Sequence, residues 1–247
     1  MVASSSLHVV EHAAADPGAP VVAIVHGAMD RSASFGRVAR QLHDVHLVRY
    51  DRRGYGRSRA VGPGTLDDHV ADLLEVLAGR PATVVGHSMG GVVALAAAAR
   101  APEAVRSVLA YEAPAPWSDW WPMPQAPAGA STPEAEAEAF MRRAIGDRFW
   151  ERLPARTRED RRLEGPALRA DLAALRSHPP FDPAEVTAPA IVACGSETTW
   201  WHRRATEELA AALPDAELAV VAGATHGVHL SHPTAFAHLV RRATARR

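Results

Sequence analysis

The hydrophobic positions of this chain alternate between two patterns. Short segments dominated by apolar residues, typical of buried strands, lie at residues 21–25, 46–50, 83–87, 107–111, 190–194 and 217–221, and the first of them is apolar throughout. Stretches with helical character fall between them, at residues 32–42, 65–77, 89–101, 202–213 and 233–244. Because strands and helices alternate, we expect an α/β fold, a doubly wound and mostly parallel sheet, with residues 7–12 as an outer strand.

One long segment breaks this alternation. Residues 113–186 begin with a stretch rich in proline and tryptophan and then show helical patterns near 134–145 and 165–176. The strand and helix alternation resumes only after this segment. We therefore expect a core made of residues 1–112 and 187–247, with residues 113–186 inserted as a helical lid.

The stretch at the centre of the predicted sheet carries a specific turn. A short buried strand at 83–87 runs into a helix of small residues, and Gly86-x-Ser88-x-Gly90 lies at the junction. A serine at such a turn is held in a strained backbone conformation that presents its hydroxyl, and glycines two residues away avoid a collision. The following helix directs its first N–H groups toward the site, which suits a developing negative charge.

Composition narrows the function. The chain has 27 basic and 28 acidic residues, for a formal net charge of −1, which gives no reason to expect a nucleic-acid partner. The absence of lysine excludes a Schiff-base enzyme and a P-loop. Cys194 is the single cysteine, and no signal peptide or membrane span is evident. We expect a cytoplasmic protein, a monomer or homodimer.

Several ordered motifs together resemble the α/β-hydrolase family over nearly the whole chain. These are His26-Gly27 after one strand, the glycine-punctuated loop 51–58 after the next, the serine turn, and a late histidine, His226. The resemblance implies that Ser88 is the nucleophile and His226 its base. It also implies an oxyanion hole made by the backbone N–H groups of Ala28 and Met89, and no cofactor.

The acid that would orient His226 stays open between two glutamates. The family usually places this acid after the strand at 190–194, where the matching position is Thr198, which cannot serve, and where Glu197 is its neighbour. Glu112 ends the strand that follows the serine turn, a place that some branches of the family use instead. We favour Glu112, because a strand end is more rigid than a loop and a triad needs fixed geometry.

A metal site is the competing interpretation of the late histidines. His226, His229 and His232 are spaced by three residues. They straddle a predicted junction between a loop and a helix, and the single cysteine does not supplement them, so we expect no metal there.

The substrate side of the predicted site is rich in aromatic residues. We expect an apolar pocket beneath the lid, bordered by a set of side chains at predicted strand ends and in the lid: His26, Trp117, Trp120, Trp121, Trp150 and Trp200. The sequence thus predicts a serine hydrolase that cleaves a small apolar ester, thioester or lactone through an acyl-serine. Two other classes stay open: a non-hydrolytic user of the same triad, such as a lyase, a cyclase or a C–C bond-cleaving enzyme, and a ligand-binding protein.

Overall fold

A central sheet organises the molecule. The structure, a computed structural model, describes residues 6–122, 132–176 and 178–246 of the chain. Within these residues the strands follow the order β1-β3-β2-β4-β5-β6-β7, and only β1 pairs in the antiparallel direction. Their bounds are β1 Val9–His12, β2 Val21–Val25, β3 His46–Tyr50, β4 Ala82–His87, β5 Val105–Tyr111, β6 Ala190–Gly195 and β7 Ala216–Val221. The expected fold class is confirmed.

Helices cover both faces of this sheet. The α-helices are α1 Gly36–Ala39, α2 Leu66–Leu77, α3 Met89–Arg100, α4 Pro133–Ile145, α5 Asp147–Arg152, α6 Ala155–Arg162, α7 Gly165–Arg176, α8 Trp200–Ala212, α9 Val228–Ser231 and α10 Pro233–Ala245. Short 3₁₀ turns cover Ser32–Phe35, Gly56–Val61 and Pro183–Glu185. No helix of the described residues combines the length and the apolar character needed to cross a bilayer.

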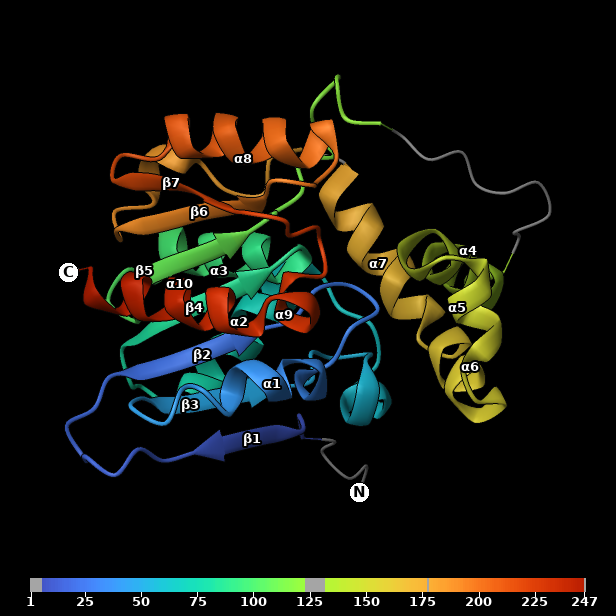
Figure 1. The fold of residues 1–247 in the computed structure, drawn as a ribbon, viewed down its shortest axis with the longest axis horizontal. Coiled ribbons are helices and arrows are strands. Elements are labelled where there is room, and N and C mark those ends of the chain that lie inside the picture. Colours follow the sequence, from blue (N-terminus) through green and yellow to red (C-terminus); the bar gives the residue numbers. More distant parts are fainter. Residues whose placement is uncertain (1–5, 123–131, 177, 247) are drawn as a thin grey trace.

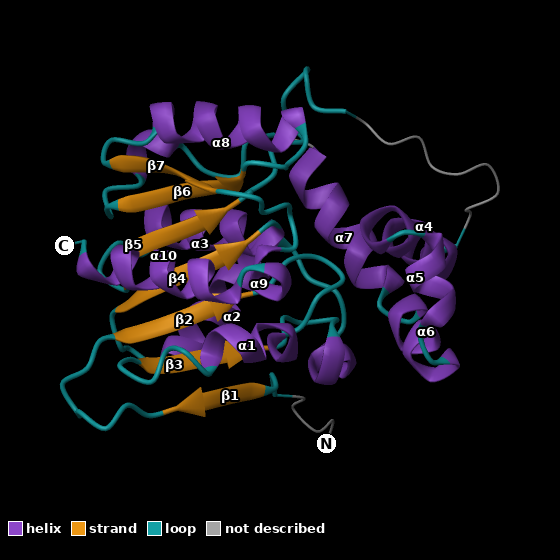
Figure 2. Cartoon of the chain, viewed as in Figure 1, coloured by secondary structure: helices purple, strands orange, loops and turns teal. Residues whose placement is uncertain are grey.

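The two faces have separate apolar cores. Helices α2, α3 and α8 pack on one face of the sheet, and α1 and α10 pack on the other (Figures 1 and 2). Strand β4 lies between β2 and β5, and all of its residues are buried. Helix α3 is rich in alanine and almost wholly buried, which lets it pack closely on β4 and β5. The serine turn therefore lies between two elements that are almost wholly buried at the centre of the sheet.

The segment between β5 and β6 forms a smaller helical unit. Helices α4 to α7 lie beyond the carboxyl ends of the parallel strands (Figure 1). Trp150 and Leu168 are fully buried at the centre of this unit, together with Met141. Met29 and Tyr55 belong to the same apolar cluster although they come from loops of the sheet domain. The inserted segment thus rests on two of the loops that follow strands.

Two local predictions differ from the structure. The helix expected at 32–42 is a 3₁₀ turn followed by the short α1, because Gly36 falls in its middle and the Ser34 hydroxyl bonds to the Arg31 carbonyl. Helices α5 and α6 were not expected from the sequence. Trp150 is the single buried residue of α5, and α6 has none, so neither has a hydrophobic periodicity to detect.

Candidate active site

The serine turn has the geometry that the sequence predicts for an exposed nucleophile. Ser88 follows β4 directly and precedes the first residue of α3, with φ of 54° and ψ of −124°. A non-glycine residue with this backbone conformation is strained and is found where the surrounding structure holds it in place. Here the Ser88 N–H donates to the Tyr111 carbonyl at 2.9 Å, and the Gly91 N–H donates to the Ser88 carbonyl at 2.7 Å.

The glycines on either side of Ser88 are required by close backbone contacts. A Cβ atom at Gly86 would lie 2.2 Å from the Gly90 carbonyl oxygen. A Cβ atom at Gly90 would lie 2.1 Å from the Val25 carbonyl oxygen. Both distances are far inside van der Waals contact, so any larger residue would push α3 away from the sheet.

The loop after β2 approaches the serine closely. A Cβ atom at Gly27 would lie 3.0 Å from the Cβ of Ser88. The Ala28 N–H donates to no described residue, and the Met89 N–H begins α3, where no intrahelical acceptor exists. Two unused donors thus lie on the segments beside Ser88. The Arg161 guanidinium of α6 donates to the Met29 carbonyl at 2.9 Å and ties this loop to the inserted segment.

Glu112 and His226 form a short hydrogen bond. The Nδ1 of His226 lies 2.6 Å from the Oε2 of Glu112, although 114 residues separate them. The other carboxylate oxygen accepts from the Gly195 N–H at 2.9 Å. Glu112 is 0% exposed, whereas the His226 side chain is 40% exposed. The buried carboxylate is therefore fixed on both oxygens and holds an imidazole that solvent can reach.

Electrostatics keep this buried glutamate ionised. Burial by itself would raise the pKa of Glu112, but the hydrogen bond and charge of His226 and the Gly195 N–H outweigh it. The net result is a Glu112 pKa below its ordinary value. An ionised acceptor at Nδ1 places the imidazole proton on that nitrogen and leaves Nε2 with a lone pair. That is the tautomer a general base requires.

Side chains from two other segments fix the loop that carries His226 by bonding to its backbone carbonyls. The Tyr111 hydroxyl donates to the Thr225 carbonyl at 3.0 Å, and the Nε2 of His87 bonds to the His226 carbonyl at 2.7 Å. The Ser88 hydroxyl makes no hydrogen bond to a described residue, including His226. Catalytic hydrogen bonds are commonly long or misaligned without substrate and tighten when it binds.

The rival glutamate lies in a different environment. Glu197 is exposed, and its carboxylate contacts the neighbouring Ser196 hydroxyl at 3.4 Å. Its backbone N–H donates to the Ala224 carbonyl at 2.9 Å, which fixes the loop while the side chain stays at the surface. The structure brings Glu112 to His226 and does not bring Glu197 there.

A second histidine beside this pair was missed by sequence reasoning. His202, in the first turn of α8, stacks on the His226 ring with centroids 4.6 Å apart and planes at 15°. Its Nδ1 lies 3.7 Å from the Oε2 of Glu112. Burial and the nearby His226 lower the pKa of His202 to about 3, so it is neutral at neutral pH. No local sequence signal marks this residue, because its role depends on how α8 packs.

Aromatic side chains continue from His202 toward solvent. Trp121 meets the His202 ring edge-on at 5.3 Å, and Trp120 lies 5.9 Å from Trp121 and 6.4 Å from Trp200 between ring centroids. Trp200 is 56% exposed. We call Trp120, Trp121, Trp200, Trp201 and His202 the aromatic surface. It borders the histidine of the candidate site, while Trp117 packs against the apolar core.

Two residues expected to border the pocket are enclosed by protein instead. His26 is 0% exposed, its Nδ1 contacts the Gly27 carbonyl at 2.7 Å, and its Nε2 accepts from the Arg52 N–H at 2.8 Å. Trp150 is also 0% exposed and donates to Glu138 at 3.2 Å. Neither side chain is at a surface that a ligand reaches in this structure. His26 braces its loop, and Trp150 fills the core of the inserted segment.

The three late histidines go to three different places. His226 bonds to Glu112, and His232 lies at the surface with its Nδ1 2.9 Å from the Ser231 hydroxyl. His229 is buried and lies 3.3 Å from Asp30. The spacing of three therefore does not bring these residues around one ion.

A surface cavity lies away from Ser88. Its volume is about 650 Å³, and it lies between the start of α2 and the end of α7, with Thr65, Arg100 and His178 in its lining. None of the expected catalytic or pocket residues borders it. The aromatic surface, by contrast, adjoins the candidate site through the stacking of His202 on His226.

Comparison with known proteins places this geometry in context. The profile of the Alpha/beta hydrolase family matches residues 22–239. A pimeloyl-[acyl-carrier protein] methyl ester esterase of Chromobacterium violaceum is 34% identical over 244 residues, which cover 88% of this chain and 91% of that enzyme. The lipase LipV of Mycobacterium tuberculosis is 33% identical over 106 residues, only 42% of this chain and 40% of the lipase.

Solved structures resemble the whole chain. The enol-lactonase of Burkholderia xenovorans LB400 superposes with a TM-score of 0.73 at 23% identity, covering 96% of this chain and 95% of its own. An alpha/beta hydrolase of Sphaerobacter thermophilus gives a TM-score of 0.75 at 24% identity, with 95% of each chain covered. At this level of identity the likeness establishes a shared fold.

Proposed function

We propose that this chain, which belongs to the alpha/beta hydrolase family, is a serine hydrolase that cleaves a carboxylic ester with an apolar acyl group. The observation that carries the proposal is the 2.6 Å bond between buried Glu112 and half-exposed His226, beside a serine held at positive φ. The curated relative from Chromobacterium violaceum, aligned over most of both chains, is named as a methyl ester esterase and supports an ester substrate.

The proposed reaction uses each group for one task. The Ser88 oxygen attacks the ester carbonyl carbon while the Nε2 of His226 takes the hydroxyl proton. The N–H groups of Ala28 and Met89 stabilise the negative oxygen of the tetrahedral intermediate. His226 then gives its proton to the departing alcohol, which leaves an acyl-serine.

Water completes the cycle. His226 takes a proton from water as the water oxygen attacks the acyl-serine carbonyl, and it returns that proton to the Ser88 oxygen as the acid leaves. Glu112 stays ionised throughout, because it stabilises the imidazolium without accepting the proton. Ester and water are consumed, and acid and alcohol are released.

The aromatic surface supports the apolar part of the substrate. Trp120, Trp121 and Trp200 offer flat apolar faces that connect to His226 through the His202 ring. The Arg204 guanidinium covers one face of Trp120 at 4.5 Å. We propose that the acyl chain lies against this surface, with the inserted segment 113–186 acting as a lid over it.

The experiment is covalent trapping followed by a substrate panel. A fluorophosphonate should add to the peptide that contains Ser88, as seen by mass spectrometry, and Ser88→Ala should abolish the addition. p-Nitrophenyl esters of increasing chain length, a thioester and a lactone should then show fastest turnover of an apolar ester. A protein that stays unlabelled and turns over no ester would contradict the proposal and favour a ligand-binding role. Esterase activity that survives Ser88→Ala would contradict Ser88 as the nucleophile.

A further inference from the structure

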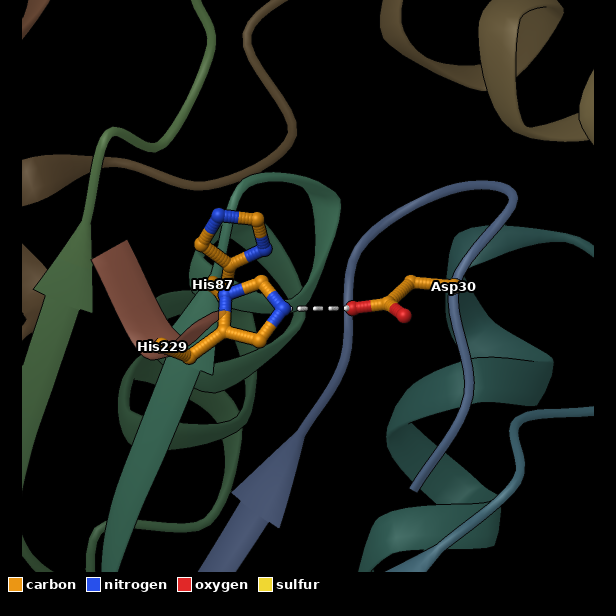
Figure 3. A group of neighbouring side chains, drawn as sticks. All are labelled: Asp30, His87 and His229. Atoms are coloured by element: carbon orange, nitrogen blue, oxygen red, sulfur yellow. Dashed lines mark ion pairs between the residues drawn. The ribbon is translucent and has the colours of Figure 1, made fainter. Parts of the chain in front are cut away.

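A second polar cluster lies directly behind the segments that carry the candidate site. Asp30 comes from the loop after β2, His87 ends β4, and His229 lies in α9. One ligand atom from each of them lies within 4.8 Å of the other two, and Figure 3 shows the contact between His229 and Asp30. The residues are distant in sequence, so only the fold brings them together.

The two histidines of the cluster are buried, and polar atoms of all three residues lack partners. His87 is 5% exposed and His229 is 3% exposed. The Nδ1 of His87, both ring nitrogens of His229 and the Oδ2 of Asp30 have no hydrogen bond to a described residue. The Nε2 of His229 and the Oδ2 of Asp30 lie 3.3 Å apart, but not in hydrogen-bond alignment. Unsatisfied buried polar groups are unfavourable, so four such atoms in one place indicate a bound partner, which is an ion or ordered water.

The hydrogen bonding of His87 prepares it to bind a cation. Its Nε2 faces the His226 carbonyl at 2.7 Å, and only a protonated nitrogen can donate to a carbonyl. The proton on Nε2 leaves a lone pair on Nδ1, the atom that has no partner. Metal-binding histidines characteristically donate their other N–H to a carbonyl or carboxylate in this manner.

The donor set and spacing suit zinc. Two imidazole nitrogens and one carboxylate oxygen are common ligands of Zn²⁺, with bonds of about 2.0–2.2 Å that place tetrahedral ligand atoms about 3.3–3.6 Å apart. The 3.3 Å between His229 and Asp30 already matches this spacing. Phe35 stacks on the His229 ring at 4.3 Å and 14°, which fixes the orientation of that ligand.

We propose that Asp30, His87 and His229 bind one Zn²⁺ ion. The three ligands come from the segments that carry Ala28, Ser88 and His226, so the ion joins all three parts of the candidate site. Its role is structural: it holds the oxyanion loop, the serine turn and the histidine loop together. The proposal does not depend on the reaction, because binding can be measured without substrate.

The test is a titration of chelator-treated protein with Zn²⁺ by calorimetry, and with Co²⁺ by visible absorption, which reports tetrahedral coordination. We expect one ion per chain and a rise in melting temperature on Zn²⁺ binding. Asp30→Asn and His229→Gln should each weaken binding at least about tenfold, and His232→Gln, just after α9, should leave it unchanged. Asp30→Asn keeps the shape of the side chain, so it remains informative if His229→Gln fails to fold.

A second possible cluster requires its own control. Glu112, His202 and His226 also bring potential ligand atoms within 4.8 Å of one another. His202→Gln should therefore leave Zn²⁺ affinity unchanged under our proposal. Absence of binding, binding that Asp30→Asn and His229→Gln do not weaken, or binding that is lost in His202→Gln would overturn the proposed site.

Discussion

Two hydrogen-bonded carboxylate–histidine pairs of the described residues, both with a buried carboxylate, differ in their surroundings. Glu112 meets His226 at 2.6 Å, and Asp171 of α7 meets the Nε2 of His69 of α2 at 2.9 Å. The His226 side chain is 40% exposed, whereas the His69 side chain is 2% exposed. By distance alone the two pairs are almost alike, so the chemistry must depend on what surrounds them.

The partners of Asp171 give that pair a structural role. The Arg52 guanidinium donates to Asp171 at 2.8 Å, and the Tyr55 hydroxyl donates to it at 2.7 Å. These bonds neutralise the carboxylate and join the inserted segment to the sheet domain. Glu112 has no arginine partner among the described residues, and its histidine keeps one nitrogen open. A carboxylate–histidine pair can therefore act as a base only where the histidine is accessible and the carboxylate charge is not already balanced.

The largest effect on activity is expected when Ser88, the nucleophile that the Glu112–His226 pair activates, is removed. Ser88→Ala should lower kcat for a p-nitrophenyl ester by about 10⁶-fold, and His226→Ala by a similar factor, because the two act as a unit. The same change at the buried pair, His69→Ala, should leave kcat of the folded enzyme within a few fold. Near wild-type turnover in Ser88→Ala would remove the distinction between the pairs.

Breaking the buried pair should affect stability rather than chemistry. Asp171→Ala leaves the Arg52 charge buried without its partner, and we expect a loss of about 3–5 kcal/mol in the free energy of unfolding. Denaturant unfolding measures this. Asp160→Ala is the matched control, because Asp160 pairs with Arg59 at 3.3 Å and both side chains are 42% exposed. Asp160→Ala should lower the free energy of unfolding by less than about 1 kcal/mol. Equal losses in Asp171→Ala and Asp160→Ala would contradict our interpretation.

The buried pair should also make the fold sensitive to acid. Burial opposes the charged form of Asp171, but the Arg52 charge and the His69 hydrogen bond outweigh it and hold the Asp171 pKa below its ordinary value. Its stabilisation is present above the unfolded pKa of about 4 and is lost as pH falls below it. Burial lowers the pKa of His69, which disfavours the folded state once pH falls below about 6.5.

Both shifts therefore act in the same direction. We expect wild-type protein to lose about 1 kcal/mol more than Asp171→Asn between pH 7 and pH 3, because the His69 contribution is common to both proteins; unfolding at each pH measures this. If the free energy of unfolding changed with pH in the same way in both proteins, the ionisation of Asp171 would make no contribution to acid sensitivity.

The smallest effect on kinetics is expected from substitutions in the aromatic surface, which lies beside the Glu112–His226 pair and not beside Asp171–His69. Trp200→Ala should raise KM for long-chain esters roughly fivefold, because an exposed apolar face for the acyl group is lost, and should leave kcat unchanged. Phe149→Ala is the control, because Phe149 is 63% exposed on α5, away from this surface. A KM that is equally affected in both variants would place the acyl chain elsewhere.

The sequence was most informative where a backbone constraint leaves a local pattern. The serine turn could be predicted because Gly86 and Gly90 have no room for a Cβ atom, which makes them visible as a motif. The parallel sheet followed from apolar runs that match strands such as β2 and β3. The confirmed fold class rests on these local signals.

Side-chain contacts between distant segments could not be predicted in this way. The choice between Glu112 and Glu197 depends on how the loop after Gly195 runs, since Glu197 bonds through its backbone and faces solvent. The Asp171–Arg52 bond spans 119 residues and leaves no periodic signal. Trp150 was expected at a pocket but is buried. Its burial depends on how the inserted helices pack together, which the sequence did not reveal.

The most direct test of the account compares the two glutamates. Glu112→Gln and Glu197→Gln keep side-chain shape, and kcat for an apolar p-nitrophenyl ester is measured alongside fluorophosphonate labelling of Ser88. We expect Glu112→Gln to lose about 10⁴ in kcat, because His226 is no longer held in its basic tautomer, and Glu197→Gln to stay within about twofold of wild type. A large loss in Glu197→Gln with little change in Glu112→Gln would contradict the central claim.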